Sequence, residues 1–214
     1  MKDINWLLKE LKCHFESEAT GHDYWHAERV WKTAMKLGKE EGARLKIIQA
    51  AALLHDVADW KLDPAKQEEG RIKIETWLSA LDYSREDQNQ VHEIMNNMSY
   101  KGGTNNHKRL SIEGQIVQDA DRLDALGAIG VARAFAYGGS KGRPLHDPEM
   151  DPANFDDFEA YKNHKGATVN HFYEKLFKLK DLMNTQSGKV MASARDEFMH
   201  AFIDQFYAEW NGEK

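Results

Sequence analysis

The sequence predicts an all-α protein. Apolar residues recur every three or four positions along most of the chain, beginning with Ile4, Leu7, Leu8, Leu11 and Phe15. This spacing is typical of one face of an amphipathic helix. No run of alternating apolar and polar residues is long enough to indicate a half-buried strand. The 214 residues include only 4 prolines and no dense Gly/Ser tract, so we expect a single helical domain over residues 1–214.

The helical spacing predicts helices over residues 3–17, 23–41, 44–59, 64–81, 84–98, 116–129, 166–184 and 188–210. Gly42 is placed to end the second of them, and Ser84 with Asp87 resembles a capping box at the start of the fifth. The helical pattern fails from Tyr137 to Lys165. A loop of this length in a compact domain is usually a functional lid or a disordered segment.

Composition narrows the class of protein. A formal net charge of -6 disfavours binding of polymeric nucleic acid through a broad basic surface, but it leaves a nucleotide substrate possible. Cys13 is the only cysteine, so neither an intramolecular disulfide nor a thiolate zinc site is expected. Charges interrupt the apolar residues of the first fifteen positions, and no stretch approaches the roughly 20 apolar residues of a membrane span. We therefore expect a cytoplasmic monomer or homodimer without a membrane partner.

One predicted helix delivers ionisable groups into an apolar interior. Between Ile47 and Leu54 the only polar side chain is Gln49, and the helix then runs into His55, Asp56 and Asp59. Buried carboxylates are paired or bind metal, because an isolated buried charge is very costly. The alternative is a His-Asp pair at a helix end that caps the helix or faces water.

Two further motifs favour a bound metal over a His-Asp pair that only caps the helix or faces water. His26 begins an H-x-x-R-V pattern upstream, and Asp121 lies in an A-D-R-L pattern downstream. This ordered set resembles the HD-domain metal-dependent phosphohydrolases over roughly residues 20–130. Residues 99–103 and 171–176 extend the resemblance to small stand-alone bacterial HD hydrolases, whose relatives cleave nucleotides. The resemblance implies an HD-domain helical bundle and a metal site made by His26, His55, Asp56 and Asp121.

Further roles follow from the resemblance and from position. Asp59 matches a catalytic glutamate of the HD hydrolases of guanosine tetraphosphate, with a shorter side chain, and is the candidate catalytic acid-base group. Arg29 and Asp124 are candidates for supporting the metal ligands, Arg29 by hydrogen-bonding a carboxylate and Asp124 by orienting a histidine or pairing with an arginine. The candidate substrate contacts are His22, Lys101, Lys141, Arg143 and Lys175, with His171 one turn before Lys175. Each of these charged residues could instead belong to an ordinary solvated surface.

Two imidazoles and two carboxylates carry a formal charge that one divalent cation neutralises. Mixed nitrogen and oxygen ligands favour Mn, with Mg, Ni, Co, Fe or Zn as alternatives. We therefore expect a metal-dependent phosphohydrolase that converts a nucleoside triphosphate to its monophosphate and pyrophosphate. The alternatives are an HD-fold di-iron oxygenase, with His22, His92 or Asp124 as extra ligands, and a catalytically idle nucleotide-binding module.

Overall fold

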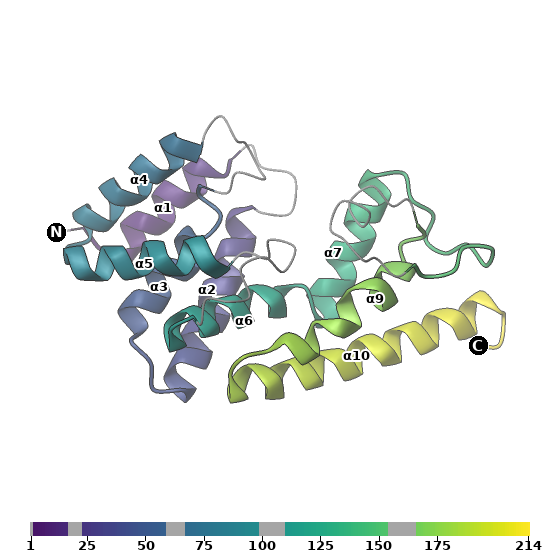
Figure 1. Cartoon of the computed structure of the whole chain (residues 1–214). Helices are drawn as coiled ribbons and strands as arrows, with labels where there is room; N and C mark the ends of the chain where they lie inside the picture. The colour runs from purple at the N-terminus through teal and green to yellow at the C-terminus, as the bar shows by residue number, and fades with distance from the viewer. Residues whose placement is uncertain (1, 17–22, 59–66, 99–109, 154–165) are drawn as a thin grey trace. The chain divides into compact units, whose positions relative to one another are not determined.

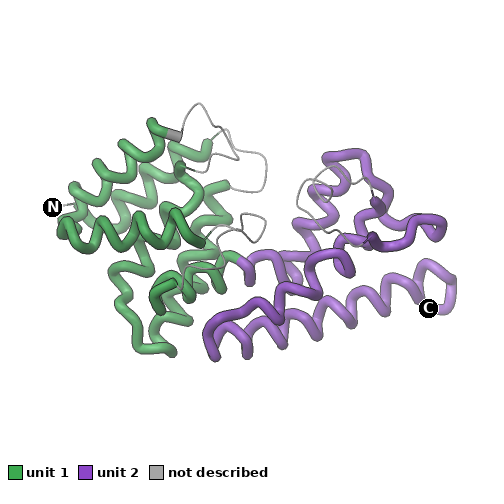
Figure 2. The backbone as a smooth tube through the Cα atoms, in the orientation of Figure 1, with its two compact units in different colours: residues 1–121 green, residues 122–214 purple. Residues whose placement is uncertain are grey.

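The computed structural model describes residues 2–16, 23–58, 67–98, 110–153 and 166–214. All regular structure in these ranges is helical, which confirms the predicted all-α fold class. The chain divides into two compact units, residues 1–121 and 122–214 (Figure 2). The expectation of one domain over the whole chain stays a prediction.

The first unit is built around a buried helix, α3 (Leu45–Leu54), which packs against α2 (Tyr24–Glu40) and α5 (Arg85–Met98) (Figure 1). The other helices of the unit are α1 (Ile4–His14), α4 (Gln67–Ala80) and most of α6 (Ile112–Asp124). Seven of the ten α3 residues are at most 1% exposed. Each large apolar side chain buried in this way contributes about 1.5–3 kcal/mol to folding, so α3 is the core of the unit.

Local signals set the ends of these helices. Gly42 has a φ of +67° and ends α2, as predicted. The Asp87 amide donates to Ser84 Oγ at 3.1 Å, which confirms the predicted cap of α5. The Asp23 carboxylate accepts a hydrogen bond from the His26 amide at 2.8 Å and caps the start of α2. A cap of this kind stabilises a helix by about 1 kcal/mol.

Two of the helices predicted before residue 130 differ from the structure. The helix predicted over 44–59 ends at Leu54, and residues 55–58 form turns, with the Val57 amide donating to Leu54 O at 3.1 Å. The helix predicted over 116–129 is divided between α6 and α7 (Gly127–Ser140). The division falls at Gly127, whose φ of +70° is incompatible with a continuous right-handed helix.

The second unit contains α7, α9 (Asn170–Glu174), two 3₁₀ turns over Leu176–Lys178 and Lys180–Leu182, and α10 (Gln186–Trp210). The helix predicted over 166–184 is thus a short helix followed by 3₁₀ turns. α10 packs against α7 (Figure 1), and the buried Phe172 ring stacks on Phe202 with centroids 6.1 Å apart. The helical pattern was expected to fail from Tyr137 to Lys165, but α7 continues to Ser140. Residues 141–153 contain no helix, as predicted, while residues 154–165 lie outside the described ranges.

Among the described residues, no helix is both long and apolar enough to cross a membrane.

Gly70 brings α4 into direct contact with the turn that follows α3. A Cβ atom at position 70 would lie 2.5 Å from Val57 O and 2.9 Å from Ala58 Cα. Both neighbours are backbone atoms, which cannot move aside as a flexible side chain can. Glycine is therefore required for this close approach, and the α4 backbone supports the turn that contains His55 and Asp56.

Replacing Gly70 with alanine should destabilise the protein by about 1–3 kcal/mol, because the added methyl group overpacks a site bounded by backbone. Gly139 in α7 offers a matched control, since an added Cβ there meets nothing within 4 Å. Gly139→Ala should be neutral or stabilising by up to about 1 kcal/mol, because alanine has the higher helix propensity. Urea denaturation of the two variants measures the difference. Equal effects of the two substitutions would show that Gly70 does not serve as a contact surface.

Candidate metal centre

His26 enters the centre from the first turn of α2. Its amide is held by the Asp23 cap, and the residue is 1% exposed. The helix start therefore fixes the backbone that carries the imidazole. The hydrophobic neighbours Ala27 and Val30 are also buried, so this face of α2 points into the first unit.

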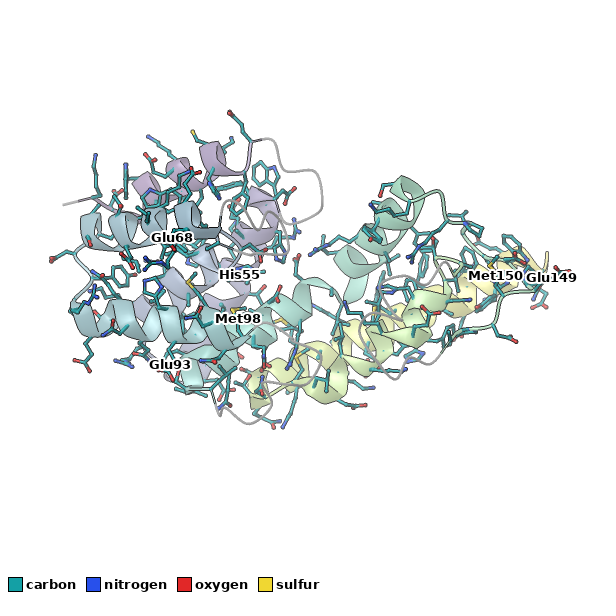
Figure 3. The ribbon with its side chains drawn as sticks, turned by 45° about the horizontal axis from the view of Figure 1, so that its top comes forward. His55, Glu68, Glu93, Met98, Glu149 and Met150 are labelled. Atoms are coloured by element: carbon teal, nitrogen blue, oxygen red, sulfur yellow. The ribbon has the colours of Figure 1, made fainter. Side chains whose placement is uncertain are left out.

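His55 and Asp56 directly follow the last residue of α3. His55 Nδ1 lies 2.8 Å from Ala52 O, and a carbonyl can only accept, so Nδ1 carries the donated proton. In the neutral ring this leaves a lone pair on Nε2, which is the form that binds metal. Figure 3 shows His55 among the helices of the first unit. The Asp56 side chain is only 7% exposed.

The donor atoms of these three residues converge. His26 Nε2 lies 3.3 Å from His55 Nε2 and 3.5 Å from Asp56 Oδ2. His55 Nε2 lies 3.3 Å from the same Asp56 oxygen. The donor atoms of these three residues all lie within 4.8 Å of one another, as the ligands of one metal ion would.

Asp121 on α6 approaches the two imidazoles from another element. Its Oδ1 lies 3.4 Å from His26 Nε2 and 3.8 Å from His55 Nε2. The Asp121 side chain is 40% exposed, in contrast to the nearly inaccessible Asp56. The centre is therefore closed on the side of α3 and accessible to solvent on the side of Asp121.

The spacing of the donors suits a divalent ion. With bonds of about 2.1 Å, neighbouring ligands lie about 3.4 Å apart around a tetrahedral ion and about 3.0 Å apart around an octahedral one. Each of the two carboxylates lies 3.3–3.8 Å from both imidazole nitrogens, and the two nitrogens lie 3.3 Å apart. These separations are close to the spacing of ligands around a bound ion, so the residues fit the ion.

The electrostatics of the centre also favour a bound divalent ion. Burial alone would lower the pKa of His55, but the Asp56 and Asp121 carboxylates and the Ala52 carbonyl outweigh it and raise the pKa to about 10. Burial would raise the pKa of Asp121, but the hydrogen bond from His26 and the charge of His55 hold it below its ordinary value. The carboxylates therefore draw positive charge into the centre. A divalent ion supplies that charge without protonating the imidazoles.

The remaining predicted site residues are distributed between the two units. Arg29 lies on α2, one turn after His26, and is half-buried. Asp124 belongs to the second unit, where Arg133 donates a hydrogen bond to its carboxylate. Lys141, Arg143 and Lys175 also belong to the second unit. His22, Asp59 and Lys101 lie outside the described residues.

Three features that hold the ligands were not predicted from the sequence. Asp23 could have been identified from the Asp-x-x-His spacing at a helix start, which is typical of an N-terminal cap. The contact of Gly70 with the turn has only a weak signal, an isolated glycine inside a helical pattern. The Ala52 carbonyl leaves no signal in the sequence, because every residue has a backbone acceptor.

Comparison with known proteins shows the family of the chain. The HD domain family matches residues 24–126, a range that includes all four candidate ligands. The Bacillus subtilis protein YpgQ is 39% identical over 96% of this chain and 92% of its own length. A crystal structure of YpgQ in complex with ADP covers 94% of this chain and 97% of that chain, at 34% identity and a TM-score of 0.72.

The crystal structure of an HD-superfamily hydrolase from Bacillus thuringiensis is more similar still in sequence. It is 45% identical, with a TM-score of 0.77, and the match covers 97% of this chain and 96% of that chain. The likeness to these relatives extends over nearly the whole chain, whereas the family match is confined to residues 24–126. The chain belongs to the HD-domain family.

Proposed function

We propose that this protein is a divalent-metal-dependent phosphohydrolase that acts on nucleotides, with Mn as the favoured ion. The observation that carries the proposal is the convergence of two imidazoles and two carboxylates with separations of 3.3–3.8 Å. The ADP complex of YpgQ supports a nucleotide as the small-molecule ligand. Mixed nitrogen and oxygen donors suit Mn and also admit Mg, Ni, Co, Fe or Zn.

His26, His55, Asp56 and Asp121 would hold the divalent ion, which would supply Lewis-acid chemistry by polarising a phosphoryl oxygen and making a nearby water more acidic. In this proposal Asp59 accepts the proton of the attacking water. Asp59 follows closely after Asp56 in the sequence. The Asp59 carboxylate therefore belongs to the segment that comes directly after the ligands His55 and Asp56. Arg29, one turn after His26, steadies a ligand carboxylate by hydrogen bonding.

Phosphate recognition is assigned to basic residues in three segments of the chain. These are Lys101, the pair Lys141 and Arg143, and Lys175, with His22 as a further polar contact. A single phosphate group needs few donors, whereas a triphosphate can use all three segments. We therefore propose cleavage between the α and β phosphates of a nucleoside triphosphate, which releases the monophosphate and pyrophosphate.

The oxygenase alternative requires more ligands than the described residues bring to the centre. Asp124 is paired with Arg133, and the charges that act on His92 are those of Glu75, Arg71 and Arg85. Metal analysis separates the two functions. Two irons per chain would favour the oxygenase, and one redox-silent ion favours the hydrolase.

The proposed reaction is tested by chromatography of the products formed from a panel of deoxynucleoside triphosphates by the Mn-loaded protein. We expect the monophosphate and pyrophosphate in equal amounts. A chelator should abolish turnover, and added Mn should restore it. Release of orthophosphate alone would contradict cleavage between the α and β phosphates. Absence of turnover with any phosphorylated metabolite would favour the idle nucleotide-binding module.

Asp59→Asn should lower kcat by about 10²–10⁴-fold and leave the bound metal unchanged, because the amide cannot accept the proton of water. Steady-state kinetics combined with metal analysis of the same sample provides the measurement. Asp63→Asn is a suitable control, since it removes a carboxylate from the same segment of the chain. An unchanged kcat for Asp59→Asn would remove this residue from the mechanism.

A further inference from the structure

The C-terminal end of α6 carries one of the candidate metal ligands. Asp121 lies in the last turn of this helix, which ends at Asp124. The last four carbonyls of a helix have no partner within it, and helix ends fray unless other groups hold them. Fraying of this turn would move the Asp121 carboxylate, whose Oδ1 lies 3.4 Å from His26 Nε2. The groups that hold the turn therefore influence the position of a ligand.

Two backbone hydrogen bonds tighten the last turn of α6. The Ala125 amide donates to Arg122 O at 3.1 Å, and the Leu126 amide donates to Leu123 O at 3.0 Å. Both bonds join residues three apart, a pattern that often closes a helix. Gly127 follows with a φ of +70°, so α6 cannot continue past this point. Any further support for the turn has to come from outside the helix.

Arg195 on α10 supplies this support. Its Nη1 donates a hydrogen bond to Leu123 O, although 72 positions separate the two residues in the sequence. The stem of the same side chain packs on Gly127, where a Cβ atom would lie 3.0 Å from Arg195 Cγ and 3.2 Å from Arg195 Cβ. Arg195 therefore fills the space that Gly127 leaves. It also places a cation at the C-terminal end of α6, where basic side chains bind the last carbonyls and the helix dipole favours positive charge.

Buried charges surround the Arg195 guanidinium. Burial lowers the pKa of Arg195, and the negative charge of Asp124 opposes this shift. Asp124 is itself buried and accepts a hydrogen bond from Arg133 on α7. An arginine stays protonated in proteins, so the bond from Arg195 to Leu123 O is charge-assisted and stronger than a bond between neutral groups. α7 and α10 thus each supply an arginine to the last turn of α6.

We infer that Arg195 is a positioning residue for the metal centre, because it holds the last turn of α6 in helical form and thereby fixes the backbone of Asp121. The inference rests on the role proposed above for Asp121 as a metal ligand. Leu123, Gly127 and Arg195 all belong to the second unit, and α6 itself carries the effect along the chain to Asp121.

Asp121 is the ligand that most needs such support. Its side chain is 40% exposed, whereas the side chain of Asp56 is only 7% exposed and is held by its surroundings. Loss of the Arg195 hydrogen bond should therefore weaken the hold of Asp121 on the ion and leave the other three ligands in place. The expected result is weaker metal binding by a protein that is still folded.

The experiment measures the Kd for Mn of the full-length protein by electron paramagnetic resonance. Arg195→Met keeps an unbranched stem beside Gly127 but removes the N–H donors, and it should weaken Mn binding about tenfold, the lower end of the effect of losing a group that supports a ligand. Arg195→Lys keeps a cation that can donate to Leu123 O and should recover most of the affinity. Arg195→Gln, with a neutral donor, should fall between the two.

Phe202→Leu is the control for a general loss of stability. It loosens the stacking of Phe202 on Phe172 in the same unit, so it should lower the melting temperature and leave the Kd for Mn unchanged. A merely structural role of Arg195 predicts the same behaviour for Arg195→Met. Wild-type affinity for Mn in Arg195→Met, or an equal loss of affinity in Phe202→Leu, would overturn the inference.

Hydrogen exchange of the metal-free protein gives a readout that does not depend on the ion. The amides of residues 121–126 should exchange faster in Arg195→Met than in the wild type, while those of the buried α3 should not. Unchanged exchange at the end of α6 would overturn the positioning role. Arg195-dependent binding of Mn by a protein that hydrolyses no phosphorylated substrate would support the positioning role and count against the proposed function, so the two failures are distinguishable.

Discussion

Burial of charged metal-binding groups at the end of an apolar helix is the constraint on which the first unit depends. α3 is almost entirely enclosed, and the two residues that follow it are a histidine and an aspartate whose side chains are nearly inaccessible. Such groups are stable in an interior only when they are paired or bind a cation. The helices around α3 supply the further ligands that a bound cation requires. α2 contributes a second imidazole, and α6 contributes a second carboxylate.

The same constraint explains three groups that position the ligands but do not themselves bind the ion. Asp23 caps α2 and thereby fixes the backbone of His26. The Ala52 carbonyl orients His55 and determines which of its nitrogens faces the centre. Gly70 allows α4 to touch the turn that carries His55 and Asp56. The donors are therefore positioned by backbone contacts, which are more rigid than contacts between long side chains.

Much of the first unit was predictable from sequence because helical periodicity and burial are local properties. The buried α3 and the cap residues Gly42 and Ser84 were identified in this way. The end of α3 at Leu54 was not, since Val57 continues the apolar spacing beyond the true end of the helix. Gly127 lies inside the helix predicted over 116–129, and its positive φ, which divides α6 from α7, depends on tertiary structure.

The candidate ligands show the same division between local and tertiary information. Asp119, Asp121 and Asp124 lie on one helix, and periodicity gave no means of choosing among them. The resemblance pointed to Asp121, and the structure places the oxygen of that residue near both imidazoles, while Asp119 is fully buried and Asp124 pairs with Arg133. In the second unit, the close approach of Gly138 to the Thr168 side chain could not be predicted, because the two residues lie far apart in the sequence.

The central claim is that His26, His55, Asp56 and Asp121 bind one divalent ion. The most direct test is the metal content of the Mn-loaded protein and of the four single alanine variants, measured after dialysis. We predict about one ion per chain for the wild type and a sharp loss in every variant, because the ion needs all four donors. Full occupancy in Asp121→Ala would contradict the claim and show that another aspartate completes the centre.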